Sequence, residues 1–125
     1  GACNLVQGEF RARSGQLREA ETSIGVLVME LSEARIDRAE QGKFIFGLRP
    51  ERISLRGGSA SDNRILGRVK EVAFTGAMSR YVVRVGESID LRVTEFNTGR
   101  RAVDFFVGDQ VKVFLPPSNM FVLED

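Results

Sequence analysis

Alternation of apolar and polar residues runs along most of the chain. Ile89-Asp-Leu91-Arg-Val93 alternates strictly, which is typical of a strand with one buried and one wet face. Related patterns predict strands at residues 5–13, 24–31, 44–48, 53–55, 66–74, 81–85, 89–96, 110–115 and 120–123. Turn residues such as Thr75-Gly76 and Thr98-Gly99 recur between these runs. Many short strands with regular turns predict a small barrel or sandwich.

A polar stretch rich in small residues divides the pattern at 57–63, where we expect a flexible loop. It separates an N-terminal strand arm, 1–56, from a C-terminal β-part, 64–125. The predicted fold is therefore all-β, a small OB-like barrel with a second β-lobe. Only 32–41 has helical composition, with Ser32 as a candidate N-cap and Gly42 as a stop. Its apolar spacing is poor, so a helix and a twisted hairpin arm both stay open.

A faint internal repeat accompanies this division. Val6-Gln-Gly8-Glu-Phe10 and Leu66-Gly67-Arg-Val69 each place a glycine two residues before an apolar residue, near the start of a predicted strand. The repeat supports a two-part design, but the match is too short to establish a duplication.

Composition excludes several classes of function. The 125 residues are 42% apolar, which suits one domain with a core. No segment approaches the ~20 apolar residues of a membrane-spanning helix. There is no histidine and a single cysteine, Cys3, so the commonest general base, a Cys-cluster zinc site and an internal disulfide are excluded. No phosphate-binding loop motif occurs. We expect neither catalysis nor a cofactor in this chain.

The nine phenylalanines and many arginines raise the possibility of single-stranded nucleic-acid binding. Most of the phenylalanines occupy apolar-periodic positions, where core packing is the ordinary explanation. The outward-facing arginines are interspersed with acids: Arg68, Arg80, Arg84 and Arg92 with Glu71, Glu87, Asp90 and Glu95. Because the net charge is only +1, we expect a mixed soluble surface and no nucleic-acid partner.

The string Gly47-Leu48-Arg49-Pro50-Glu51 is the most distinctive in the chain. Pro50 cannot donate to a strand ladder and fixes its own φ, so the chain must bend here. Arg49 is expected to anchor the bend by pairing with backbone carbonyls or an acid. A structural corner and a partner-contacting site, with Arg49, Pro50 and Glu51 as its residues, both remain open.

Further candidates for structural or partner contacts lie in the C-terminal part. Gly76 and Gly108 fall between strand-like runs and are predicted to adopt positive φ, and Asp109 follows the second of them. Phe105 and Phe106 are adjacent, so in an extended strand their rings point to opposite faces. One ring enters the core, while the other is covered within the monomer or contributes to weak dimerisation.

Several strings together resemble the transport-associated OB (TOBE) domain. They are Gly47-Leu-Arg-Pro-Glu51-Arg-Ile-Ser-Leu55, Gly67-Arg-Val-Lys-Glu-Val-Ala-Phe-Thr-Gly76, Tyr81-Val-Val-Arg-Val and Val107-Gly-Asp-Gln-Val111. The opening Gly1-Ala-Cys-Asn4-Leu with Gly8 is similar to the segment that follows the ATPase domain in ATP-binding subunits of ABC-type importers. The ending from Val113 to Asp125 is most similar to the spermidine and putrescine branch.

The resemblance implies that residues 1–125 are a single C-terminal domain whose ATPase domain is absent from this sequence. ATP and magnesium would then bind only in that missing domain. The implied partners are the chain's own ATPase domain, a second copy in a homodimer and the membrane permease subunits. The implied location is the cytoplasmic face of the cell membrane. Some relatives bind oxyanions such as molybdate, but no matching pocket is evident, so that ligand is not carried over.

Two functions from different classes follow from these observations. The first is a regulatory and assembly domain of a polyamine importer that supports ATP-driven uptake. The alternative is a free-standing OB-type barrel that binds a small ligand or single-stranded nucleic acid. A phosphate-loop motif in the upstream coding region would distinguish them.

Overall fold

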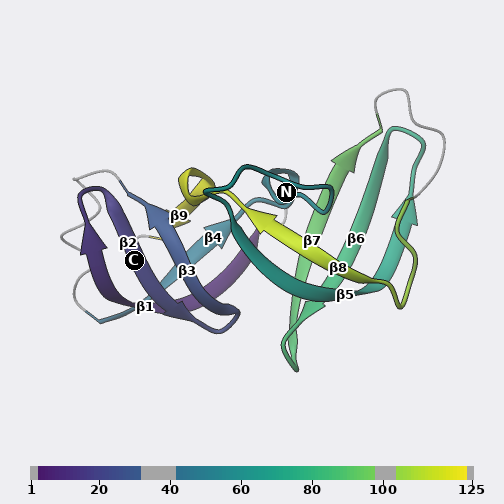
Figure 1. The fold of residues 1–125 in the computed structure, drawn as a ribbon. Helices are drawn as coiled ribbons and strands as arrows, with labels where there is room; N and C mark the ends of the chain where they lie inside the picture. The colour runs from purple at the N-terminus through teal and green to yellow at the C-terminus, as the bar shows by residue number, and fades with distance from the viewer. Residues whose placement is uncertain (1–2, 32–41, 98–103, 124–125) are drawn as a thin grey trace.

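The computed structural model describes residues 3–31, 42–97 and 104–123, which form two antiparallel sheets side by side (Figure 1). The first sheet has the order β3-β2-β1-β4-β9 and contains β1 (Asn4–Ser14), β2 (Leu17–Thr22), β3 (Gly25–Glu30), β4 (Lys43–Leu48) and β9 (Met120–Val122). The second has the order β7-β6-β5-β8 and contains β5 (Asn63–Phe74), β6 (Met78–Val85), β7 (Ile89–Phe96) and β8 (Gln110–Leu115). The predicted all-β fold of OB-like lobes is confirmed. The 32–41 segment lies outside the described residues.

The two sheets repeat the same design. In each, the first strand pairs with both the second and the fourth. Gly8 pairs with Thr22 and Phe44, and Gly67 pairs with Val85 and Val111 in the same way. A bulge then follows at the same distance from each glycine, between Phe10 and Ala12 and between Val69 and Glu71. The faint sequence repeat is therefore a structural duplication, with Gly8 and Gly67 at equivalent positions.

The two lobes also exchange segments. After β4 the chain passes through the 3-10 turn η1 (Pro50–Arg52), and Ser54 then pairs with Phe114 of β8 in the second sheet. After β8 it passes through η2 (Pro117–Asn119), and β9 then pairs with β4 in the first sheet. The 57–63 loop lies between the sheets, as predicted, but the last strand returns to the first lobe. The segment after β4 therefore pairs with the second sheet, and the segment after β8 pairs with the first sheet.

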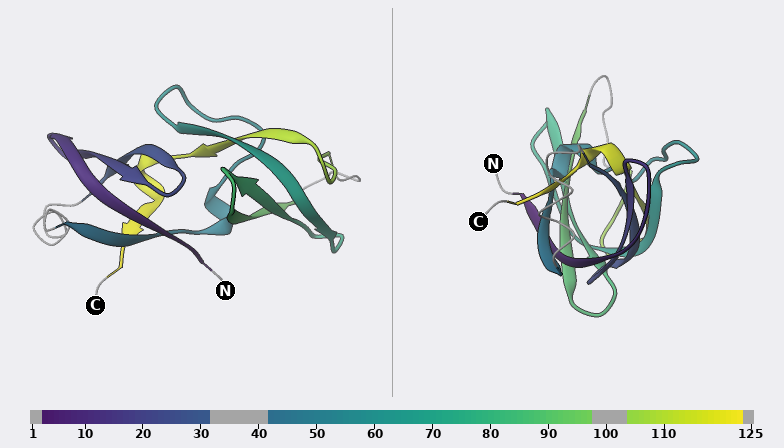
Figure 2. Two further views of the ribbon diagram at one scale, coloured as in Figure 1. Left: turned by 90° about the horizontal axis from the view of Figure 1, so that it is seen from below. Right: turned by 90° about the vertical axis from the view of Figure 1, so that its left-hand side faces the viewer.

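The core lies on the inner faces of the curled sheets, which surround it when the molecule is viewed along its length (Figure 2, right). Alternate residues of each strand point inward, for example Tyr81, Val83 and Val85 of β6. Gly47 is required for close packing, because a Cβ there would lie 2.6 Å from Cε2 of Phe121 in β9. No helix among the described residues has the length and hydropathy needed to cross a membrane.

Candidate functional site

A buried asparagine, Asn4, forms hydrogen bonds to both lobes where they meet. The sequence did not indicate this residue as a functional candidate. Asn4, at the start of β1, donates through Nδ2 to the carbonyls of Leu48 (3.1 Å) and Arg92 (2.9 Å). Its Oδ1 accepts from the backbone N–H of Arg92 at 2.7 Å. The Asn4 side chain therefore bonds both the N–H and the carbonyl of Arg92. Because β7 is an edge strand, these backbone groups have no neighbouring strand on that side to pair with.

Asn63, the equivalent residue at the start of β5, makes the reciprocal contacts. Its Nδ2 donates to the carbonyls of Val28 (2.9 Å) and Leu115 (3.0 Å), and its Oδ1 accepts from the N–H of Val28 at 2.7 Å. The first strand of each lobe thus binds the third strand of the other. We call Asn4 and Asn63 the asparagine clasp. A sequence signal existed, since each asparagine stands four residues before a repeated glycine, Gly8 or Gly67.

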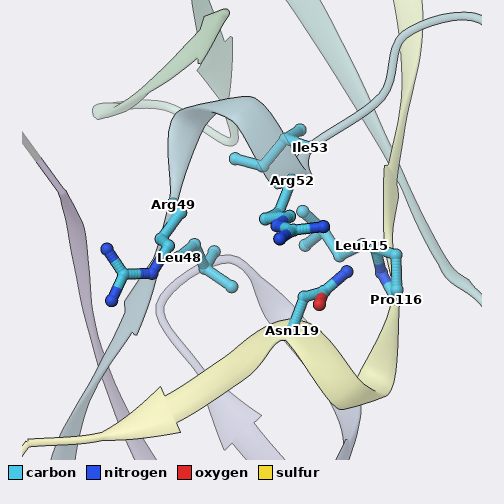
Figure 3. A pocket seen from close by; sticks show the side chains of 7 residues that line it. All are labelled: Leu48, Arg49, Arg52, Ile53, Leu115, Pro116 and Asn119. Carbon is cyan, nitrogen blue, oxygen red and sulfur yellow. The ribbon is translucent and has the colours of Figure 1, made fainter.

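A narrow crevice lies between the two 3-10 turns (Figure 3). It is too narrow to hold a water molecule. Arg52 of η1 and Asn119 of η2 extend into it from opposite sides, whereas the guanidinium of Arg49 points away (Figure 3). The apolar part of the lining comes from both lobes: Leu48, Ile53, Leu115 and Pro116. The crevice is a packed junction between the lobes and has no space for a ligand.

The predicted bend is present, but its arginine has a different partner from the one expected. Pro50 begins η1, and Arg49 immediately precedes it in an extended conformation. Within the described ranges the Arg49 side chain makes no hydrogen bond or ion pair. Its guanidinium carbon instead lies 5.2 Å from the centroid of the Phe121 ring, a cation–π contact with β9. Arg49 therefore contacts the returning strand, while Glu51 is exposed.

A wider groove of about 380 Å³ opens beside η2. Oxygen atoms dominate its polar lining, which contains two carboxylates and three serines and includes no lysine or arginine. The carboxylate of Asp62 accepts from the backbone N–H (3.0 Å) and hydroxyl (3.1 Å) of Ser59. The lining residues are Leu17, Val28, Glu30, Ser59, Ser61, Asp62, Pro116, Pro117 and Ser118. Such a lining suits an amine or a hydroxyl-rich ligand and would repel an anion.

The duplication places different chemistry at the equivalent positions of the other lobe. The strand registers relate Leu17, Val28 and Glu30 to three residues of the second sheet, Arg80, Arg92 and Thr94. Two apolar residues on the groove side of the first lobe, Leu17 and Val28, thus correspond to arginines in the second lobe, and Glu30 corresponds to a threonine. The two halves share a backbone design but differ in charge at these three positions.

Arg56 joins three segments on the inner side of the second lobe. Its guanidinium forms ion pairs with Glu95 of β7 and Asp104 and lies 5.2 Å from the centroid of Phe105. The Phe105 ring in turn packs edge-on against Tyr81, with centroids 5.7 Å apart. Burial lowers the pKa of Arg56, but the hydrogen bonds and charges of Asp104 and Glu95 outweigh it and raise the pKa above its ordinary value. Glu95, which was expected among the acids of the mixed outer surface, instead lies on the same face of β7 as Leu91 and Val93 and is largely buried.

Phe105 and Phe106 have the opposite environments that adjacent residues predict. Phe105 is half-buried against Tyr81, whereas Phe106 is 62% exposed. Phe106 begins a turn in which its N–H donates to Oδ2 of Asp109 at 2.9 Å and its carbonyl accepts from the Asp109 N–H at 3.0 Å. Gly108 has φ of 97°, and Gly76 has φ of 82° in its own turn, so both positive-φ predictions are confirmed.

Across residues 3–31, 42–97 and 104–123, no group of three or more His, Cys, Asp or Glu side chains is placed to hold a metal ion. Cys3 donates through its thiol to the carbonyl of Leu48 at 3.5 Å and lies beside the asparagine clasp.

Comparison with known proteins agrees with this fold. A solved structure of the cytoplasmic molybdate-binding protein ModG, with molybdate bound, superimposes with a TM-score of 0.79, covering 95% of this chain and 94% of that one. The two sequences are 11% identical, so this likeness concerns the fold. A search among curated protein sequences gives no match. The family model of the TOBE domain matches residues 46–123, from the end of β4 through β9, and the chain therefore belongs to the TOBE domain family.

Proposed function

We propose that this chain is the regulatory and assembly domain of the ATP-binding subunit of an ABC-type importer, of the spermidine and putrescine branch. The observation that carries the proposal is membership of the TOBE family across residues 46–123. That match includes the bend at Arg49–Glu51 and the complete second sheet. In this role the domain lies on the cytoplasmic face of the membrane, contacts its own ATPase domain and the permease subunits, and belongs to a homodimer of the parent subunit.

The joined lobes support an assembly role for the domain. The asparagine clasp and the exchange of β9 connect the two lobes into one unit, so partners bound to different lobes would be held in a fixed relative orientation. ATP binding and hydrolysis belong to the ATPase domain in this proposal, and this chain supplies contacts and orientation.

The test uses the full-length subunit encoded by the reading frame that contains these residues. The frame should encode a phosphate-loop motif upstream of Gly1. Deletion of residues 1–125 should reduce uptake of radiolabelled putrescine in cells that lack the native subunit, while the remaining protein still binds ATP. An upstream frame without a phosphate loop, or unchanged uptake after the deletion, would overturn the proposal.

A second candidate is small-ligand binding by the groove beside η2. The reason to consider this candidate is the similarity in fold to ModG, whose structure contains bound molybdate. The groove lining, with Glu30 and Asp62 and no basic residue, favours an amine over an oxyanion. Calorimetric titration should therefore detect putrescine and not molybdate. If neither ligand binds, this candidate is excluded and the importer proposal is unaffected.

A further inference from the structure

The outer face of β5 and β8 carries a group of cations around one exposed leucine. Leu66 is 59% exposed and pairs directly with Lys112. Arg64 and Arg68 lie two residues away on either side of Leu66, so all four side chains share the outer face. We call Arg64, Leu66, Arg68 and Lys112 the β5–β8 strip.

The charge of the strip is not neutralised within the described part of the chain. Arg64 lies 5.7 Å from the centroid of the Phe114 ring, and Arg68 donates to the carbonyl of Gly108 at 2.7 Å. No carboxylate pairs with the three cations of the strip.

Arginines outside the strip do have acidic partners. Arg84, which lies next to Arg68 on the same sheet, binds both oxygens of Asp90, at 2.8 and 3.1 Å. In the first sheet, Arg11 binds Glu19 and Glu21 at 2.9 and 3.0 Å. The β5–β8 strip therefore differs from the surrounding mixed surface by its unbalanced positive charge.

An apolar tip adjoins the strip. Phe106 and Val107 are 62% and 66% exposed at the turn that precedes β8. The Asp109 carboxylate closes this turn, and backbone hydrogen bonds to Val69 (2.8 and 2.9 Å) attach it to the bulge of β5. The bond from Arg68 to Gly108 joins the tip to the strip. Two apolar side chains are thus displayed on a fixed turn, so binding would cost little ordering of the protein.

We propose that the β5–β8 strip and the Phe106–Val107 tip form a docking site for an acidic protein segment that carries an apolar side chain. Guanidinium groups bind carboxylates in a bidentate geometry, so Arg64 and Arg68 match Glu or Asp side chains of the partner. Leu66 and Val107 match its apolar residue. A nucleic-acid strand would satisfy the cations but could stack its bases on only one exposed ring of the site, Phe106, because Leu66 and Val107 are aliphatic.

The experiment uses a short fluorescein-labelled peptide of alternating Glu and Ser with a central Leu, and measures its binding by fluorescence anisotropy. Three further probes are the same peptide with Ser in place of Leu, the Gln version of the peptide, and an oligothymidylate of equal length. The variants are Lys112→Glu, Arg68→Glu and Leu66→Ser. Lys43→Glu, an exposed lysine on β4 of the other sheet, is the matched control for the charge change. Circular dichroism establishes that each variant is folded.

The proposal predicts salt-sensitive binding of the Leu peptide that Lys112→Glu and Arg68→Glu each weaken by about tenfold, whereas Lys43→Glu changes it by less than about twofold. Leu66→Ser should reduce the affinity for the Leu peptide to that of the Ser peptide. Absence of binding, or equal losses from Lys112→Glu and Lys43→Glu, would overturn the proposal. Tighter binding of oligothymidylate than of the Leu peptide would overturn it in favour of a nucleic-acid partner.

Discussion

Asn4 and Arg92, which are 88 residues apart in the sequence, are joined by two hydrogen bonds in which Asn4 donates once and accepts once. Asn63 makes the same pair of bonds with Val28. Because backbone groups at the edge of a sheet are costly to bury without partners, these asparagines determine how the two lobes meet. The contacts are specific in geometry, and aspartate could not replace the donated bonds.

Removing either asparagine of the clasp should destabilise the protein by a similar amount. Asn4→Ala and Asn63→Ala each leave buried backbone groups of the opposite lobe without a partner, so each should lower the free energy of unfolding by about 1–3 kcal/mol. Urea titration measures both values. Asn97→Ala is the control, because Asn97 is half-buried like Asn63 but bonds only within the second lobe, to Ser79 and Gly76, so its loss should have a smaller effect. A large loss for one clasp variant and none for the other would show that the two contacts are not equivalent.

Gly47 should tolerate a side chain only when Phe121 is removed. A Cβ at Gly47 collides with the Phe121 ring, so Gly47→Ala should cost about 1–3 kcal/mol, because the ring must move and its contact with Arg49 is disturbed. In a Phe121→Ala background, the same substitution should cost much less. Thermal melts of the single and double variants give the coupling. Equal costs of Gly47→Ala in both backgrounds would mean that another contact limits this position.

Replacement of Gly76 or Gly108 by Val should destabilise the protein by more than ~1 kcal/mol. Neither glycine has a neighbouring atom that a Cβ would meet, so the cost arises from backbone strain at positive φ alone. Ala73→Val, at an exposed position on β5, is the control and should be close to neutral. Unchanged melting temperatures for both glycine variants would contradict the assigned turn conformations.

The Arg84–Asp90 pair should make a small, pH-dependent contribution to stability. The pKa of Asp90 lies below its ordinary value of 3.8, mainly because Arg84 donates hydrogen bonds to its carboxylate. Burial acts in the opposite direction, but it does not outweigh these bonds. The folded-state pKa is thus lower than the unfolded one, so the contribution is fully present above the ordinary value and is lost as the pH falls through the folded value.

Asp90→Asn should therefore lower the melting temperature at pH 7 and have less effect at about pH 2, where the wild-type carboxyl is also neutral. Because both side chains are exposed, the shift at pH 7 should be small. Arg84→Gln should reproduce it. An effect of Asp90→Asn that is equal at both pH values would show that the ion pair is not its origin.

Local patterns in the sequence were sufficient to predict the all-β class, the glycine turns and every described strand except β2 (Leu17–Thr22), which was missed. The strand predicted at 53–55 is only a single bridge, between Ser54 and Phe114. Strict alternation in 89–93 indicates a strand with one buried face. Gly76 and Gly108 have positive φ, a backbone conformation that other residues rarely adopt. The adjacent rings of Phe105 and Phe106 had to differ in environment, but the pattern could not say which was inside. The inward position of Phe105 depends on Tyr81 and Arg56, which come from distant segments.

The contacts between lobes were not predictable in this way. The exchange of β9, the clasp of Asn4 and Asn63, and the contact of Arg49 with Phe121 all join residues far apart in the chain. Alternation carries no information about which sheet a strand enters. The Asn-x-x-x-Gly spacing shared by both halves did carry a signal, and its meaning became clear only when the paired registers aligned the two sheets.

The central claim is that the two lobes form one clasped module that unfolds as a unit. Differential scanning calorimetry of the whole chain tests this claim most directly. The account predicts a single transition whose calorimetric and van't Hoff enthalpies agree. In the Asn4→Ala/Asn63→Ala double variant the transition should move to lower temperature. Two separate transitions in the wild-type protein, one for each lobe, would contradict the account.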